Sequence, residues 1–95
     1  MNQEKLLQIV RDSMVTAYAG SRAATFDPIT HILGPSPRQE IWPHVVRMIK
    51  KDLGPAVDIE MPEFEQDPTI HEYVVELDKR IAKQEGREGR EVRLK

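Results

Sequence analysis

Hydrophobic residues recur at helical spacing in three stretches of the chain, and the first stretch covers residues 3–19. The apolar positions there stand mainly four residues apart, at Leu6, Val10, Met14 and Tyr18. This spacing places them on one face and predicts an amphipathic helix. Gly20 is suited to end that helix, because glycine readily adopts the left-handed conformation that follows a last helical turn.

Residues 20–35 form the long connection that follows this helix. They are rich in turn-forming residues, and the pair Asp27-Pro28 suits the cap and the first position of a helix. We therefore expect a short helical turn over residues 28–33. Four apolar side chains are expected to hold the connection against the core: Phe26, Ile29, Ile32 and Leu33.

The second stretch opens with the strongest helix-start signal in the chain. Ser36 is placed to be the N-cap, and Pro37 suits the first helical position. Gln39 stands three residues after Ser36, which is the spacing of a capping box. The sequence therefore predicts a helix from this point.

That helix is expected to run to about Leu53, because Gly54-Pro55 cannot continue it. Pro43 lies inside it and predicts a kink or a restart, since proline removes one backbone hydrogen bond. The expected core face holds Ile41, Val45, Met48 and Ile49.

Residues 54–67 form a second connection. Val57, Ile59 and Met61 alternate with acidic residues, which is the period of a strand. No clear partner strand accompanies this run, so we expect an extended loop with one short turn at 63–66 that inserts Phe64 into the core.

The third helical stretch follows directly. Asp67 is expected to be its N-cap and Pro68 its first residue, and its apolar positions are Ile70, Val74, Leu77 and Ile81. Residues 83–95 are mostly charged and predict a disordered tail. The folded domain is therefore expected to cover residues 1–82.

These elements predict an all-α fold, a small bundle of three main helices plus a short helix, with a long loop between the first two main helices. The chain has 95 residues, which is enough for one domain with a modest core. It has no cysteine, no apolar run long enough to cross a bilayer and no signal-peptide pattern, so we expect a cytoplasmic protein that does not enter membranes. A formal charge of −2 does not favour nucleic acid as a partner.

The candidate chemistry is sparse. The histidines, His31, His44 and His71, lack metal-ligand spacing, and there is no cysteine to complete a zinc set, so no metal site is expected. The chain also lacks nucleotide-binding and nucleophile-elbow motifs. It is therefore expected not to be an enzyme but to present something to partner proteins.

The middle helix carries the candidate docking residues. Arg47, Lys50 and Lys51 share one face, with Arg38 a few turns earlier. They form either a solvated helix face or a docking patch for an acidic partner or a phosphate. Trp42 either fills the core or is an exposed binding anchor.

Short motifs across residues 3–82 occur in an order that resembles acyl carrier proteins and peptidyl carrier domains. The segment 26–34 is similar to the family's phenylalanine, spacer and Leu-Gly before the modified serine. Residues 59–63 resemble its extended segment with isoleucine and proline, and residues 68–73 resemble the start of its last helix.

This resemblance implies a four-helix bundle in which a serine, by position Ser36, carries 4′-phosphopantetheine through a phosphodiester. The thiol of that arm holds an acyl or aminoacyl group as a thioester, and the carrier docks on partner enzymes mainly through the helix after the serine. Pro35 and Pro37 stand where the family has aspartate and an aliphatic residue. Ser36 therefore remains open to two interpretations, the attachment site of a carried group or only the cap of a helix.

Three hypotheses follow for the function. The first is a specialised carrier modified at Ser36. The second is a carrier-fold protein without the arm, acting as an interaction or regulatory subunit through Trp42 and the basic face. The third, least favoured by the near-neutral charge, is a nucleic-acid-binding regulator that uses the basic helix.

Overall fold

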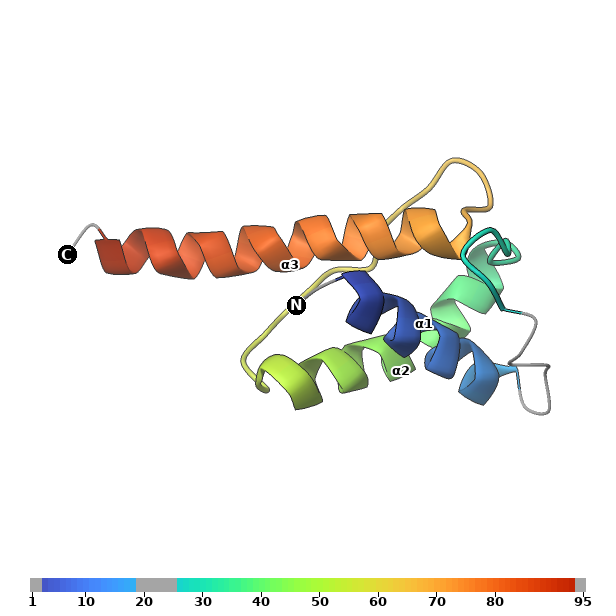
Figure 1. Ribbon diagram of the computed structural model, residues 1–95, viewed down its shortest axis with the longest axis horizontal. Helices are drawn as coiled ribbons and strands as arrows, with labels where there is room; N and C mark the ends of the chain where they lie inside the picture. Colours follow the sequence, from blue (N-terminus) through green and yellow to red (C-terminus); the bar gives the residue numbers. More distant parts are fainter. Residues whose placement is uncertain (1–2, 19–25, 94–95) are drawn as a thin grey trace.

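Three helices make up the fold, as the apolar spacing predicts. The computed structural model describes residues 3–18 and 26–93, with side chains described as far as residue 84. Helix α1 covers Gln3–Ala17, α2 covers Pro35–Leu53 and α3 covers Ile70–Arg93. Helix α1 packs against both α2 and α3 (Figure 1), and the described residues contain no strand, which confirms the all-α bundle.

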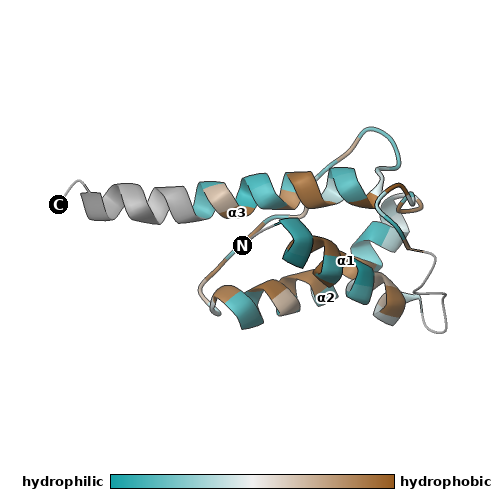
Figure 2. Cartoon of the chain, viewed as in Figure 1, coloured by the Kyte–Doolittle hydropathy of each residue, from teal (hydrophilic) through white to brown (hydrophobic). Residues whose placement is uncertain are grey.

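The core is one cluster of buried apolar residues that includes residues of all three helices, and brown, hydrophobic stretches lie on each of these helices in Figure 2. Every apolar position predicted for the third helix is buried, and so are most of those predicted for the first two. Met48 and Tyr18 are the exceptions, since each is partly buried against the edge of the core. The fully buried positions of the three helices include Leu6, Val10, Met14, Ile41, Val45, Ile49, Ile70, Tyr73, Leu77 and Ile81.

The helix ends differ from the sequence prediction in detail. Helix α2 passes through Pro43 without a restart, and Pro43 lies on the exposed face of the helix. Residues 54–67 form a loop, as expected, and Phe64 packs against the core. The predicted stop at Gly20 lies outside the described residues.

Helix α3 begins at Ile70, two residues later than predicted. The Glu72 N–H donates to Thr69 Oγ1 at 3.2 Å, and the Thr69 N–H donates to the Glu72 carboxylate at 3.4 Å. Thr69 and Glu72 thus form a reciprocal capping box. Asp67 is therefore not the cap, because its side chain and carbonyl group serve other partners described below.

Helix α3 continues to Arg93, well beyond the end that the apolar spacing predicts, so the backbone of residues 83–93 is helical where a disordered tail is expected. Apart from two glycines, this part of the chain consists mostly of good helix formers. The last buried residue of the core is Ile81 among the side chains described. Beyond Ile81, none of the described side chains of α3 is buried in the core.

Removal of residues 85–95 is expected to leave the domain intact, because all the described core residues precede this segment. The free energy of unfolding should change by less than about 0.5 kcal/mol. Urea unfolding followed by circular dichroism measures this change. A larger loss would show that the end of the chain packs on the bundle in solution.

Candidate functional site

Ser36 lies on the surface in the first turn of α2, at the end of the long loop from α1. The prediction that Ser36 caps this helix is wrong, because Gly34 is the N-cap and Pro35 is the first helical residue. Gly34 adopts φ 74° and ψ −179°, which allows the chain to turn into the helix at Pro35. Within the described part of the chain the Ser36 hydroxyl makes no hydrogen bond, so it has no capping role there.

The loop before Ser36 is fixed to the start of α3 by backbone hydrogen bonds. The Ile32 N–H donates to the Pro68 carbonyl at 2.8 Å, and the Ile70 N–H donates to the Thr30 carbonyl at 2.9 Å. These bonds use the backbone groups that a local helix would need. The predicted short helix over 28–33 is therefore absent, and an isolated bridge between His31 and Thr69 lies in its place.

Two side-chain contacts complete the attachment of this loop. The Gly34 N–H donates to Asp67 Oδ1 at 3.0 Å, and a ring nitrogen of His31 bonds the Asp67 carbonyl group at 3.1 Å. At the other end of the loop, Asp27 Oδ1 accepts from the Ile29 N–H at 3.2 Å in a tight turn. The loop thus enters α2 in a defined conformation that sets the position of Ser36.

Two apolar residues of this loop point to solvent rather than to the core. Ile29 is 76% exposed and Leu33 is 70% exposed, whereas Ile32 is fully buried and Phe26 is partly buried. The expectation that all four hold the loop to the core is therefore wrong for Ile29 and Leu33. Backbone hydrogen bonds to residues at the start of α3 hold the loop in place, so the side chains of Ile29 and Leu33 are not needed for this.

The first turn of α2 leaves Ser36 accessible, while the Asp67 carboxylate occupies the N–H of the preceding Gly34. Ser36 is exposed, and the first turn contains no acidic residue that would repel a phosphate. The N-terminal end of a helix also carries a partial positive charge. Pro35 and Pro37 have no N–H, so only Ser36 among the first three residues can offer a backbone donor. The site can therefore hold a covalently attached phosphate but is a poor cradle for a free one.

Arg38, a predicted docking residue, is buried with only 8% of its surface exposed. Its guanidinium group lies 5.7 Å from the centroid of the Phe64 ring, and Phe64 stacks on Tyr73 at 6.0 Å. Burial raises the pKa of the Tyr73 phenol well above its usual range, and the nearby charge of Arg38 opposes that rise. Arg38 is therefore a polar member of the core and no part of an exposed basic face.

Several buried polar atoms around Arg38 have no hydrogen-bond partner among the described residues. They are Nη1 of Arg38 and the hydroxyl groups of Tyr18 and Tyr73. Burial, followed by the charges of Glu40 and Asp67, raises the pKa of Tyr18. An unpartnered buried donor destabilises a fold by about 1–3 kcal/mol. This cluster is therefore a weak point of the core.

Replacing Arg38 by methionine is expected to leave the fold as stable or to stabilise it by up to about 2 kcal/mol. The change removes the desolvation penalty of Nη1 and loses a cation–π contact of about 0.5–1 kcal/mol. Urea unfolding of both proteins gives the difference. Arg47→Met, at an exposed position of the same helix, is the matched control and should change stability by less than about 0.5 kcal/mol. A loss above that value in Arg38→Met alone would contradict the expectation.

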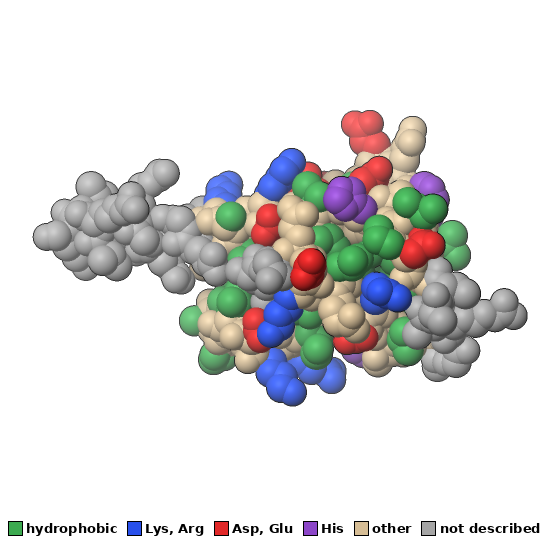
Figure 3. Space-filling model, viewed as in Figure 1, with side chains coloured by type: hydrophobic (Ala, Val, Ile, Leu, Met, Phe, Trp, Pro, Cys, Tyr) green, Lys and Arg blue, Asp and Glu red, His purple; other side chains and the backbone are tan. Residues whose placement is uncertain are grey.

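The other predicted docking residues lie away from Ser36. Trp42 is partly buried and packs against the core, so it is not a free anchor. Arg47 is exposed and Lys50 is partly exposed, toward the C-terminal end of α2. Fourteen residues separate Ser36 from Lys50, which corresponds to about 20 Å along the helix. Figure 3 shows clustered basic side chains along one edge of the molecule.

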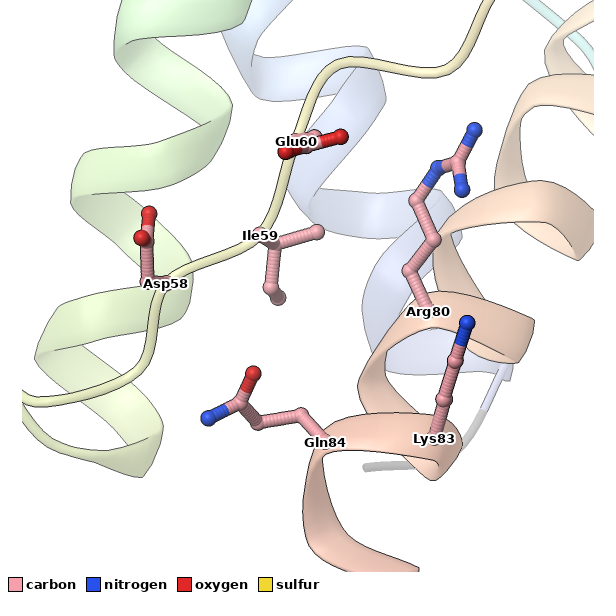
Figure 4. A pocket seen from close by; sticks show the side chains of 6 residues that line it. All are labelled: Asp58, Ile59, Glu60, Arg80, Lys83 and Gln84. Atoms are coloured by element: carbon pink, nitrogen blue, oxygen red, sulfur yellow. The ribbon is translucent and has the colours of Figure 1, made fainter. Parts of the chain in front are cut away.

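A groove that the sequence does not predict lies between the loop after α2 and helix α3. Its volume is about 430 Å³. Figure 4 shows Asp58, the buried Ile59 and Glu60 on the loop at one side of the groove, and Arg80, Lys83 and Gln84 on α3 at the other. Its lining consists of Asp58, Ile59, Glu60, Arg80, Lys83 and Gln84. Because the two walls carry opposite charges, this groove has no net preference for an anion or a cation.

The described part of the chain contains neither a metal-binding cluster nor a membrane-spanning helix. No cluster of three or more histidine and carboxylate residues there is arranged to hold a metal ion. Among the helices in those ranges, none combines the length and apolar character of a membrane span.

Comparison with known proteins adds no relative to this picture. The chain matches no protein-family model, no curated protein and no solved structure. Its function is therefore inferred from the order of its motifs and from the placement of Ser36 and the loop before it.

Proposed function

We propose that this chain is an acyl-carrier-like protein that presents an acyl or aminoacyl group to partner enzymes on a 4′-phosphopantetheine arm attached to Ser36. The observation that carries the proposal is the placement of Ser36. Its hydroxyl group is exposed, makes no hydrogen bond with the described residues and stands at the start of α2. Because Ser36 does not cap the helix, the main property that its position provides is access for a modifying enzyme.

The order of the elements supports the same proposal. A first helix, a long loop, a serine at the start of the second helix, an extended segment and a last helix follow one another along the chain. The motifs that resemble carrier proteins fall on these elements in the same order. The short extra helix of the family is absent from residues 54–69, which lie outside any helix.

The arm would supply the thiol that holds the cargo, and the residues of the chain would only position it. During attachment the Ser36 oxygen would bond to the phosphorus that carries pantetheine in coenzyme A, and adenosine 3′,5′-bisphosphate would leave. The hydroxyl proton would pass to a base of the modifying enzyme. The hydrogen bonds from the Gly34 and Ile32 N–H groups to Asp67 and Pro68 would fix the position of the attachment point.

The test is incubation of the full chain with coenzyme A and a broad-specificity phosphopantetheinyl transferase. We expect the intact mass to rise by one phosphopantetheinyl group, and we expect Ser36→Ala to show no rise. Ser13→Ala is the matched control, because Ser13 is 2% exposed and its hydroxyl donates to the Ile9 carbonyl at 2.8 Å. It should be modified like the original chain.

The mass of the protein purified from its own organism gives an independent result. The arm should be present there if a dedicated enzyme attaches it. An unmodified mass in both measurements, or a mass gain that persists in Ser36→Ala, would refute the attachment at Ser36.

A second candidate function is a carrier-fold protein without the arm that acts as an interaction or regulatory subunit. The two prolines beside Ser36 favour it, because they remove backbone donors from the first turn of α2. The partly buried position of Trp42 argues against that residue as its anchor. An unmodified native mass together with a stable native partner would favour this function.

A further inference from the structure

We infer that residues 27–34, in the described part of the loop before α2, form with the hollow beside them a docking surface of this protein, and that it fits a partner segment carrying apolar side chains flanked by lysine or arginine. We call this surface the loop patch, made of Ile29 and Leu33 together with the lining of the hollow. The inference goes beyond the proposed function, since it applies with or without an arm on Ser36.

Exposed apolar surface is the first observation. Ile29 and Leu33 are the large hydrophobic residues that the described part of the chain exposes most, at 76% and 70%. Both belong to the described part of the loop that leads to Ser36 and stand four residues apart. Exposed apolar side chains beside an apolar hollow are typical of interaction sites.

A hollow of about 190 Å³ lies next to this loop. Its apolar lining comes from three elements, with Leu7 on α1, Pro28 in the loop and Val74 on α3. Pro28 is the direct neighbour of Ile29. An apolar side chain of a partner could therefore enter the hollow while its neighbours contact Ile29.

The loop is held in its exposed conformation before any partner arrives. The His71 N–H donates to the Pro28 carbonyl at 3.0 Å, and the bonds from Ile32 and Gly34 fix the other end. A surface that is already ordered loses little conformational entropy on binding. This order also explains how two apolar side chains remain in water without collapsing onto the core.

The charge around the loop patch selects the partner. Glu4 lines the hollow, Asp27 precedes Pro28 in the loop and Glu72 follows His71 at the start of α3. All three are acidic and exposed, and Arg11, partly exposed one turn beyond Leu7 on α1, offsets only part of their charge. Figure 3 shows hydrophobic, histidine and acidic side chains in the right-hand part of the view, with basic side-chain atoms beside them.

This acidic rim argues against a second copy of the chain as the occupant, because two copies would bring like charges together. It equally argues against an acidic partner at this end. The exposed cations Arg47 and Lys51 lie about 20 Å or more from Leu33 along α2. Next to Glu4, the ammonium group of Lys5 bonds the Asp52 carboxylate at 2.6 Å.

The test uses the full chain labelled with ¹⁵N and two synthetic amphipathic helical peptides. One peptide is built from leucine and lysine, and the other has glutamate in place of every lysine. We expect the lysine peptide to shift the amide signals of residues 27–34 and 71–74 and the glutamate peptide to leave them unchanged. No coenzyme A is involved, so failure of the arm proposal does not affect this result.

Two double variants define the surface. Ile29→Ser with Leu33→Ser should raise the Kd of the lysine peptide at least about tenfold, because the apolar contacts are lost. Arg47→Ser with Lys51→Ser should change it by less than about threefold in either direction. The thermal midpoint of each variant confirms that the exposed changes leave the fold intact.

The inference is overturned if the lysine peptide shifts signals elsewhere, if the glutamate peptide binds equally well, or if the Ile29 and Leu33 variant binds unchanged. It is also overturned if sedimentation shows a dimer of the chain alone that the same variant abolishes, because a second copy would then cover the patch.

Discussion

Replacing Leu77 by alanine is expected to lower the free energy of unfolding by about 2–5 kcal/mol. Leu77 is fully buried in α3, in the cluster that joins all three helices. The change removes apolar contacts and leaves a cavity that the rigid neighbours cannot fill. A domain of this size has only about 5–15 kcal/mol of stability in total. Urea unfolding followed by circular dichroism measures the loss.

Leu33→Ala is the matched control for this prediction, since it makes the same chemical change at a position that is 70% exposed. It should alter the free energy of unfolding by less than about 0.5 kcal/mol. Equal losses in the two variants would contradict the assignment of Leu77 to the core and of Leu33 to the surface. The pair therefore tests the arrangement of the fold as well as its stability.

The helices could be predicted because their apolar residues repeat at a single period over many turns. Leu6, Val10 and Met14 already place one face of α1 in the core without any knowledge of its neighbours. Short signals are less decisive, because several residues near a helix end can act as its cap. Asp67 and Thr69 compete in this way, and the spacing of Thr69 and Glu72 is the signal that could have identified the right one.

The loop before α2 could not be predicted, because its conformation depends on residues far along the chain. Asp27-Pro28 is a good local signal for a helical turn, yet the backbone groups of this loop bond to Pro68 and Ile70 instead. The exposure of Ile29 and Leu33 follows from these distant bonds. Local spacing contains no information about them.

Ser36 could be identified from the sequence, but its environment could not. Its place between the loop and α2 follows from the order of the motifs, whereas the helix begins two residues earlier than predicted, so that Gly34 and not Ser36 is the cap. The burial of Arg38 follows from helical spacing, since Arg38 stands three residues before Ile41 on the core face of α2, toward Phe64 and Tyr73. Charged residues are rarely buried, so composition alone assigns it to the surface.

Gly34→Ala is expected to lower the free energy of unfolding by about 1–3 kcal/mol and to slow the proposed modification of Ser36 by the transferase. Gly34 combines φ 74° with ψ −179°, a region that is essentially restricted to glycine. An added methyl group would meet nothing within 4 Å, so the loss comes from the backbone and not from a clash. Relief of that strain would rotate the start of α2 and move Ser36 relative to the loop patch.

Gly54→Ala separates the loss of stability from the change in access to Ser36. Gly54 has φ 120° and ψ 153° at the other end of α2, and its added methyl group also has free space. We expect a similar loss of stability, measured by urea unfolding, but an unchanged rate of mass gain with coenzyme A and the transferase below the unfolding temperature. If both variants slow the reaction equally, general destabilisation is the cause and the conformation of Gly34 has no special part in presenting Ser36. If Gly34→Ala alone slows it, the turn at Gly34 sets the access of the modifying enzyme to the serine.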